Sequence, residues 1–272
     1  MRILFTFMCV LALGVMGCSE TSGTGGSGGE GGTAGTGGSA GAGGTGGMPE
    51  VRMYQFAIDE LNPDGTTPPL EGVQVCEADA DPENCAMSNV GGFVALFLPA
   101  NQEVTITMDK EGYGRWVTGD VSDETYDPAV TGRRMYTDAQ LEAVAGQLQT
   151  PYPWQGGIVG LVTFPNLPAG GATFAPVGST VDAVGDSFYY DSATEEYSLD
   201  LEATTAVGES WLLPLAEGGF TEITPGEQQF EYGGTAGDCE ASWAWPGDTP
   251  NTIRVPVREG YRTYGSMICT GQ

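Results

Sequence analysis

The sequence predicts a mainly β protein: two small β-sandwich units joined by one short amphipathic helix and preceded by a disordered Gly-rich tether. Strand-like segments recur at short intervals between Gly, Pro and Asn turn signals, which is typical of β-sandwiches. One segment has the apolar spacing of a helix. Many of the 44 glycines lie between Glu20 and Gly47, in a stretch without large apolar residues.

The first predicted unit covers residues 49–130. Phe93 to Leu98 is an apolar run with the length of a buried strand. Glu103 to Met108 alternates apolar and polar residues, which places Val104, Ile106 and Met108 on one face of a strand. The other strands predicted here are Val51 to Ile58 and Gly72 to Cys76.

A connector over residues 131–155 carries the predicted helix, residues 138–149. Thr137 and Gln140 have the spacing of a capping box, and Pro151 ends the helical pattern. The apolar residues recur at helical spacing on one face: Leu141, Val144, Ala145 and Leu148. We expect this face to pack against a sandwich of the same chain; the alternative is a helix that binds a partner.

The second predicted unit covers residues 156–272. It contains further short β-rich segments separated by turn signals. The strands predicted here are Gly156 to Phe164, Gly170 to Phe174, Ser187 to Tyr190, Ser210 to Leu213, and Ile253 to Val257.

The N-terminus has the pattern of a cleaved export signal over residues 1–17. An apolar run follows Met1-Arg2 and is shorter than the ~20 residues that a membrane-spanning helix needs. The closing residues, Val15-Met16-Gly17-Cys18, resemble the lipobox of bacterial lipoproteins. The resemblance implies that Cys18 becomes the lipid-modified N-terminus. The alternative is an ordinary signal peptide that happens to contain this cysteine.

Residues 18–48 form the predicted linker. Because this stretch is almost entirely Gly, Ser, Thr and Ala, it cannot offset its ordering entropy by burying apolar surface. As a flexible coil it would span about 30 Å and hold the folded part away from a membrane. Ser19 stands where Asp would retain a lipoprotein at the inner membrane. The prediction is therefore a lipid anchor in the outer membrane of a Gram-negative-type bacterium.

Segments between residues 69 and 117 resemble carboxypeptidase regulatory-like domains, which are small transthyretin-like β-sandwiches. Pro69 to Val75 is similar to their opening strand, and Val104 to Tyr113 to a later strand. Gly91-Gly92-Phe93 followed by Leu98-Pro99-Ala100 looks like their hairpin, although Asn101 replaces the usual turn Gly. In peptidases this domain is an accessory to a separate zinc catalytic domain, so the resemblance implies a non-catalytic module.

Charge and composition exclude several function classes. The chain has 36 acidic and 9 basic residues, a net charge of −27, and a single lysine, Lys110. Nucleic-acid binding requires clustered Lys and Arg, so we expect no nucleic-acid partner. The sequence has no histidine, which removes His-dependent triads and His-ligated zinc. We therefore predict no enzyme activity; an enzyme that uses carboxylates alone is the alternative.

Four cysteines remain after Cys9 and Cys18 are set aside with the signal and the lipid site: Cys76, Cys85, Cys239 and Cys269. In an oxidising compartment they favour disulfides, and three pairings are open. Local pairing, Cys76 with Cys85 and Cys239 with Cys269, is the simplest. A four-cysteine metal site is the alternative.

Two groups are candidates for ligand binding. Asp79, Asp81 and Glu83 alternate within one loop, which indicates either a solvated acidic loop or a Ca²⁺ site without EF-hand spacing. Trp243 and Trp245 would lie on one face of any strand they share. They suggest either core packing or an aromatic platform for carbohydrate.

The sequence as a whole predicts a non-catalytic cell-envelope lipoprotein that displays β-sandwich domains in a structural or adhesion role. The alternative is a carbohydrate- or Ca²⁺-dependent binding module at the cell surface. We expect the membrane as one partner, through the lipid anchor, and an unidentified envelope protein or glycan as another. No cofactor is expected, apart from Ca²⁺ in the alternative.

Overall fold

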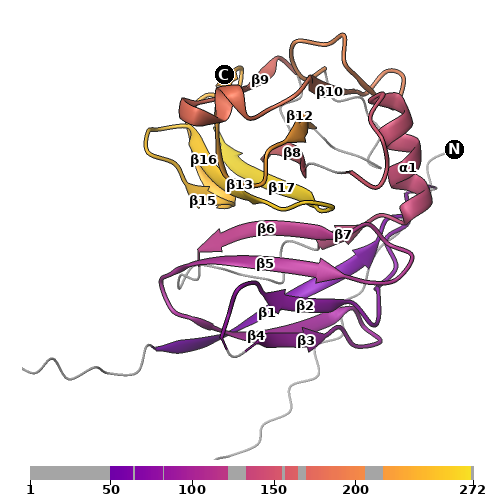
Figure 1. Ribbon diagram of the computed structural model, residues 1–272, viewed down its shortest axis with the longest axis vertical. Helices are drawn as coiled ribbons and strands as arrows, with labels where there is room; N and C mark the ends of the chain where they lie inside the picture. The colour runs from indigo at the N-terminus through magenta and orange to yellow at the C-terminus, as the bar shows by residue number, and fades with distance from the viewer. Residues whose placement is uncertain are drawn as a thin grey trace, which may run out of the picture. The chain divides into compact units, whose positions relative to one another are not determined.

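A computed structural model describes residues 50–63, 65–81, 83–121, 133–154, 157–164, 170–205 and 217–270. The predicted signal, Cys18 and linker lie outside these residues, as does the strand expected from Ser210 to Leu213. Met48–Gln272 form one compact unit. The predicted mainly β class is confirmed, with three sheets and one α-helix in the described part of the chain (Figure 1).

The first sheet has three strands in the order β4-β1-β7. Strand β1 pairs antiparallel with β4 and parallel with β7. The bounds are β1 Val51–Glu60, β4 Phe93–Pro99 and β7 Arg133–Met135. This sheet covers a core whose other wall comes from one half of a ten-stranded sheet.

That half has the strand order β6-β5-β2-β3. Strand β5 presents Val104, Ile106 and Met108 to the core, as its alternation predicts. The opposite wall contributes Val94, Leu96 and Leu98 of β4. The bounds are β2 Gln74–Glu77, β3 Asn84–Met87, β5 Glu103–Asp109 and β6 Trp116–Val121.

Strands β4 and β5 do not form the hairpin that the family resemblance implied. Strand β4 pairs with β1, whereas β5 pairs with β2 and β6. The turn at Asn101, with φ +55°, therefore carries the chain from one sheet to the other. Because both strands direct alternate apolar residues into one core from opposite sides, their burial favours two facing layers over one hairpin.

Strand β4 is buried on one face only, so the expectation of a fully buried strand is wrong. Phe93 and Phe97 are 55% and 61% exposed. In register beside Phe97 on β1 lies Met53, which is 56% exposed. The outer face of this sheet is thus apolar in part, although continuous hydrophobicity suggested burial on both faces.

The other half of the ten-stranded sheet has the order β11-β10-β12-β8-β17, with β14 also pairing with β17. A four-stranded sheet, β15-β16-β13-β9, packs residues of β9, β13 and β16 into the same second core. The bounds are β8 Gly157–Phe164, β9 Ala172–Pro176, β10 Ser187–Asp191, β11 Glu196–Ser198, β12 Glu217–Ile223, β13 Gly226–Gly234, β14 Cys239–Trp243, β15 Trp245–Pro246, β16 Thr252–Val257 and β17 Arg262–Cys269. A short 3₁₀ helix, η1, spans Gly178–Asp182.

Strands β6 and β17 pair in parallel through Arg262 opposite Trp116 and Thr263 opposite Val117. This pairing links the regions predicted as the first and second units. Thr118 on β6 adds a side-chain hydrogen bond, its Oγ1 donating to the carbonyl of Tyr264 at 2.9 Å. The hydrogen-bonded sheet therefore continues across the division that turn signals suggested.

Helix α1 spans Asp138–Gln147 and begins with the predicted capping box. The Thr137 side chain accepts from the backbone N–H of Gln140, whose own side chain accepts from the Thr137 N–H at 2.7 Å. Leu141, Ala145 and Leu148 pack with Trp154, Ile158 and Phe188 in a third apolar cluster. The helix is therefore a packed element of its own chain, as expected from its apolar face.

Candidate functional site

The two tryptophans considered as a carbohydrate platform are core residues. Trp243 ends β14 and Trp245 begins β15, so they do not share a strand. They are only 6% and 9% exposed, and Trp245 Nε1 donates to the carbonyl of Val104 at 3.0 Å. Their rings fill space between strands, in agreement with the packing interpretation.

A buried cation stacks on Trp243. The guanidinium carbon of Arg133 lies 4.0 Å from the centroid of the Trp243 ring. Arg133 Nη2 also lies 3.3 Å from Asp120 Oδ2, and both side chains are almost fully buried. The aromatic ring and the carboxylate together compensate the charge of a desolvated arginine.

In the acidic loop considered as a Ca²⁺ site, one of the three carboxylates already forms an ion pair. Asp79 forms an ion pair with Arg258, while Asp81 is exposed. Oε1 of Glu83 lies 3.2 Å from Sγ of Cys85. The three carboxylates therefore have three different surroundings, and one of them is already neutralised by an arginine.

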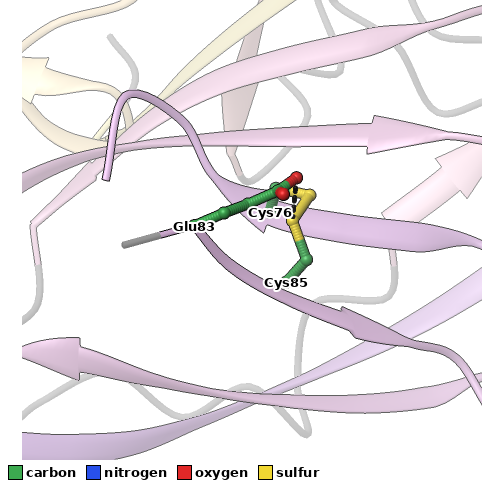
Figure 2. A group of neighbouring side chains, drawn as sticks. All are labelled: Cys76, Glu83 and Cys85. Carbon is green, nitrogen blue, oxygen red and sulfur yellow. Dashed lines mark hydrogen bonds between the residues drawn. A yellow bond between two sulfur atoms is a disulfide. The ribbon is translucent and has the colours of Figure 1, made fainter. Parts of the chain in front are cut away.

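Both locally paired disulfides are present: Cys76–Cys85 and Cys239–Cys269. Cys76 and Cys85 face each other on β2 and β3, and Cys239 and Cys269 do so on β14 and β17. Figure 2 shows the carboxylate of Glu83 directed at the first bond. The sulfur and carboxylate atoms lie close enough together to hold a metal ion. Since the metal ligand is a thiolate, the closed disulfide does not offer these sulfurs as ligands.

A second buried ion pair joins Glu217 of β12 to Arg262 of β17. Sequence reasoning missed it, because the two residues are far apart in the chain and sit in ordinary strand patterns. Burial raises the pKa of the Glu217 carboxyl above its usual value, and the nearby Arg262 opposes that shift. Burial also raises the pKa of the surrounding phenols of Tyr136, Tyr197 and Tyr264.

An open cleft of about 710 Å³ lies where several turns meet the end of the large sheet. Its lining includes Met87, Gln74 and Asp109, which are opposite one another on β3, β2 and β5. Residues opposite each other on adjacent strands share a face, so these side chains form one row. The rest of the lining comes from Gly72, the β5–β6 turn, Gly260, the start of α1 and Tyr152-Pro153.

Hydrogen bonds hold several cleft side chains in place. Arg115 pairs with Asp109 and stacks on Tyr261, with its guanidinium carbon 3.9 Å from the ring centroid. The Tyr261 hydroxyl donates to Asp109 Oδ2 at 3.1 Å. Across the cleft, the Tyr152 hydroxyl donates to Asp138 Oδ1 at 2.6 Å. The pKa of Tyr152 is raised, first by burial and then by this hydrogen bond.

The β5–β6 turn contributes a cation and an aromatic ring. Lys110 Nζ donates to the carbonyl of Glu71 at 2.8 Å and lies 5.7 Å from the centroid of the Tyr113 ring. The Tyr113 hydroxyl donates to Glu60 Oε2 at 3.0 Å. The sequence singled out Lys110 as the single lysine, but it gave no signal that distant Gln74 or Tyr152 would lie near it.

A smaller pocket of about 330 Å³ is lined by Pro151 and Trp154, which flank the Tyr152-Pro153 segment in the sequence. Its lining includes Trp154, whose buried indole N–H has no hydrogen-bond partner among the residues that the structure describes. Glu222 also lines it, with φ +51°, at an irregularity in the β12–β8 pairing. This pocket has fewer polar groups than the larger cleft.

Comparison with known proteins identifies no family. No family model matches the chain, and no curated protein does so. Similar solved structures include the Bacillus anthracis TIE protein, at 9% identity and a TM-score of 0.22, covering 81% of this chain and 34% of that one. The chain thus spans about a third of the length of that protein.

Two pilins are also among the similar structures. The shaft pilin SpaA of Lactobacillus rhamnosus GG, as its D295N mutant, is 11% identical with a TM-score of 0.22, covering 82% of this chain and 99% of that one. The minor pilin GBS52 of Streptococcus agalactiae is 10% identical with a TM-score of 0.20, covering 80% and 97%. At such scores these likenesses carry no functional argument. Among the described residues, no helix is long and apolar enough to cross a membrane.

Proposed function

We propose that the chain is a non-catalytic lipoprotein of the bacterial cell envelope that displays a disulfide-braced β-sandwich unit in a structural or adhesion role. The observation that carries the proposal is the pair of disulfides, Cys76–Cys85 and Cys239–Cys269. Disulfides persist in oxidising compartments, which include the periplasm and the cell surface. The lipobox-like sequence before Cys18 supports the same location and adds an anchor.

The buried polar groups support a structural interpretation of the charged residues. Glu217 is paired with Arg262, and Asp120 with Arg133, inside the protein. Each carboxylate has an arginine partner and little access to solvent, so neither is placed to act on a substrate. The carboxypeptidase regulatory-like resemblance is part of this proposal and supports a non-catalytic module.

The lipid anchor can be tested by metabolic labelling of the full chain with an alkyne-bearing palmitate analogue in a Gram-negative host. We expect the Cys18→Ser variant to lose the label and to accumulate as the uncleaved precursor. Cys9→Ser is the matched control, since Cys9 belongs to the apolar run of the signal, and it should be labelled normally. Equal labelling of the Cys18→Ser variant would refute the anchor.

Whether the anchor lies in the outer or the inner membrane can be tested at Ser19, the residue that follows the lipid site. Sucrose-gradient fractionation should place the protein in the outer membrane, and Ser19→Asp should move it to the inner membrane. Ser22→Asp lies farther along the tether and is the matched control for the added charge. Protease treatment of intact cells then distinguishes the two faces: degradation supports surface display, and protection contradicts it.

Ca²⁺ dependence is the second function retained from the sequence, and the local contacts give it less support. Asp79 is paired with Arg258, which lowers the negative charge available to a cation. Binding to the folded state would raise the unfolding midpoint, by about 2.7 kcal/mol of stability at a hundredfold excess over Kd. An unchanged midpoint in millimolar Ca²⁺ would contradict this function.

A further inference from the structure

The open cleft between Met87 and Tyr152 has unused hydrogen-bonding groups. Within the part of the chain that the structure describes, the side chains of Gln74 and Glu111 make no hydrogen bond or ion pair. Gln74 offers two donors and a carbonyl acceptor, and Glu111 offers two acceptor oxygens. Lys110 uses one of its three protons on the carbonyl of Glu71. These groups can bind a ligand that both donates and accepts.

Other polar side chains of the cleft are fixed before any ligand arrives. Asp109 accepts from Arg115 and from Tyr261, and Tyr152 is held by Asp138. Side chains that are already ordered lose little conformational freedom on binding, so preorganisation favours affinity. The cleft therefore combines fixed polar groups with a few free ones.

The cleft also has apolar surface. Tyr113 and Tyr152 line it with aromatic rings, and Met87 lines it while 57% exposed. A sugar ring has C–H faces that pack on such surfaces and hydroxyl edges that bond to amides and carboxylates. The volume of about 710 Å³ lies within the ~300–1,000 Å³ typical of small-ligand sites.

The charges of the lining favour an uncharged ligand. The lining includes two basic residues, Lys110 and Arg115, and three acidic residues, Asp109, Glu111 and Asp138, so its formal charge is 2 − 3 = −1. The whole chain has a net charge of −27. An anionic ligand would meet the repulsive field of the whole protein, and the nearly balanced cleft gives a cation little local attraction.

From these observations we propose that the cleft is a binding site for a neutral oligosaccharide, with Gln74 and Glu111 bonding to its hydroxyls and Tyr113 and Tyr152 packing on its rings. These cleft residues, and not the buried Trp243 and Trp245, would then contact the carbohydrate. It goes beyond the proposed display role and needs no lipid anchor.

The test is titration calorimetry on the full-length protein in detergent, with maltotetraose, cellotetraose and chitotetraose as neutral probes. Tetragalacturonate is the anionic comparison. We expect at least one neutral tetrasaccharide to bind, and to bind more tightly than tetragalacturonate. Gln74→Ala and Glu111→Gln should each weaken binding by about 2- to 10-fold, the effect of one net hydrogen bond.

Two matched controls separate the cleft from the rest of the surface. Gln55→Ala removes an exposed amide from β1, and Glu142→Gln neutralises an exposed carboxylate on α1. Neither residue lines the cleft, so both variants should keep the parental affinity. Saturation-transfer NMR should show contact from tyrosine ring protons to the bound sugar.

Three results would overturn the proposal. They are no heat of binding from any neutral tetrasaccharide at millimolar concentration, equal affinities in the Gln74→Ala and Gln55→Ala variants, and preference for tetragalacturonate. The Cys18→Ser variant should bind like the parent. Failure of the lipid anchor and failure of the sugar site are therefore distinguished.

Discussion

Arg262 Nη2 donates to Glu217 Oε1 in the interior of the protein, where the two side chains are 9% and 0% exposed. The pair joins β17 to β12, two strands that both flank β8 in the large sheet. The guanidinium carbon of Arg262 also lies 4.9 Å from the centroid of the Tyr136 ring. Charges in such surroundings depend on each other, because water cannot compensate either one alone.

Breaking this pair should destabilise the protein strongly. Glu217→Leu and Arg262→Met should each lower the free energy of unfolding by about 3–5 kcal/mol, since each leaves a buried group without its partner. The double variant Glu217→Leu/Arg262→Met should regain much of that loss. Urea denaturation of the four proteins gives the coupling energy.

An exposed pair provides the control for this cycle. Arg254 lies 3.0 Å from Glu227, and their side chains are 21% and 51% exposed. Glu227→Gln should change stability by less than about 1 kcal/mol. Additive losses at Glu217 and Arg262 would contradict the coupling of the buried pair.

The two disulfides should contribute unequally to the free energy of unfolding. They close loops with sequence separations of 9 and 30 residues. Loop entropy predicts about 2.6 kcal/mol for Cys76–Cys85 and about 3.6 kcal/mol for Cys239–Cys269. Urea midpoints of the Cys76→Ala/Cys85→Ala and Cys239→Ala/Cys269→Ala variants measure both. A larger loss from the shorter loop would contradict this order.

Two glycine substitutions should have opposite effects. A Cβ at Gly219 on β12 would lie 1.8 Å from the carbonyl oxygen of Val159, whereas a Cβ at Gly146 on α1 meets nothing within 4 Å. Gly219→Ala should therefore prevent correct pairing of β12 with β8. Gly146→Ala should stabilise the protein by about 0.5–1 kcal/mol, through helix propensity. Thermal unfolding followed by circular dichroism compares them, and equal midpoints would refute the steric argument.

The protein should lose stability in alkali. Burial, followed by the charges of Glu195 and Glu217, raises the pKa of Tyr190 from 10.0 to about 12. The folded state therefore keeps a proton that the unfolded state releases near pH 10. Stability from this group is complete below pH 10 and is lost as pH rises through about 12.

Urea midpoints measured across this range, with tyrosinate absorbance recorded in parallel, check the alkaline prediction. Tyr197 and Tyr264 have pKa values that burial raises further, so they should ionise only on unfolding. Tyr190→Phe should reduce the slope of stability against pH. If all 11 tyrosines of the folded protein ionise near pH 10, the prediction fails.

Local signals in the sequence predicted many of the elements. Alternation identified β5 and its buried face, and the capping box at Thr137 identified the start of α1. The same signals were less informative for β4, because a continuous apolar run does not reveal that Phe93 and Phe97 face outward. Proximity in sequence favoured the two disulfide pairs that form, and Cys76 and Cys85 lie on the consecutive strands β2 and β3. Cys239 and Cys269 lie on β14 and β17, which pair although β15 and β16 separate them in the chain.

The candidate cleft was beyond the reach of sequence reasoning. Gln74, Lys110 and Tyr152 come from separate parts of the chain, and none of them belongs to a motif that specifies a ligand. Trp243 and Trp245, the tryptophans considered as a carbohydrate platform, are buried because strand packing places them in the interior. Aromatic spacing along a strand does not by itself distinguish a platform from a core.

The sequence by itself determined the mainly β class, a capped helix and the composition that excludes histidine chemistry, and it favoured the local cysteine pairs among three possible pairings. These properties depend on residue type and on neighbours a few positions away. Only the tertiary structure decided that β6 pairs with β17, that Glu217 meets Arg262, and that one cleft collects polar groups from several turns. The physical reason is that long-range strand pairing depends on how whole sheets bury their apolar faces, which no local pattern specifies.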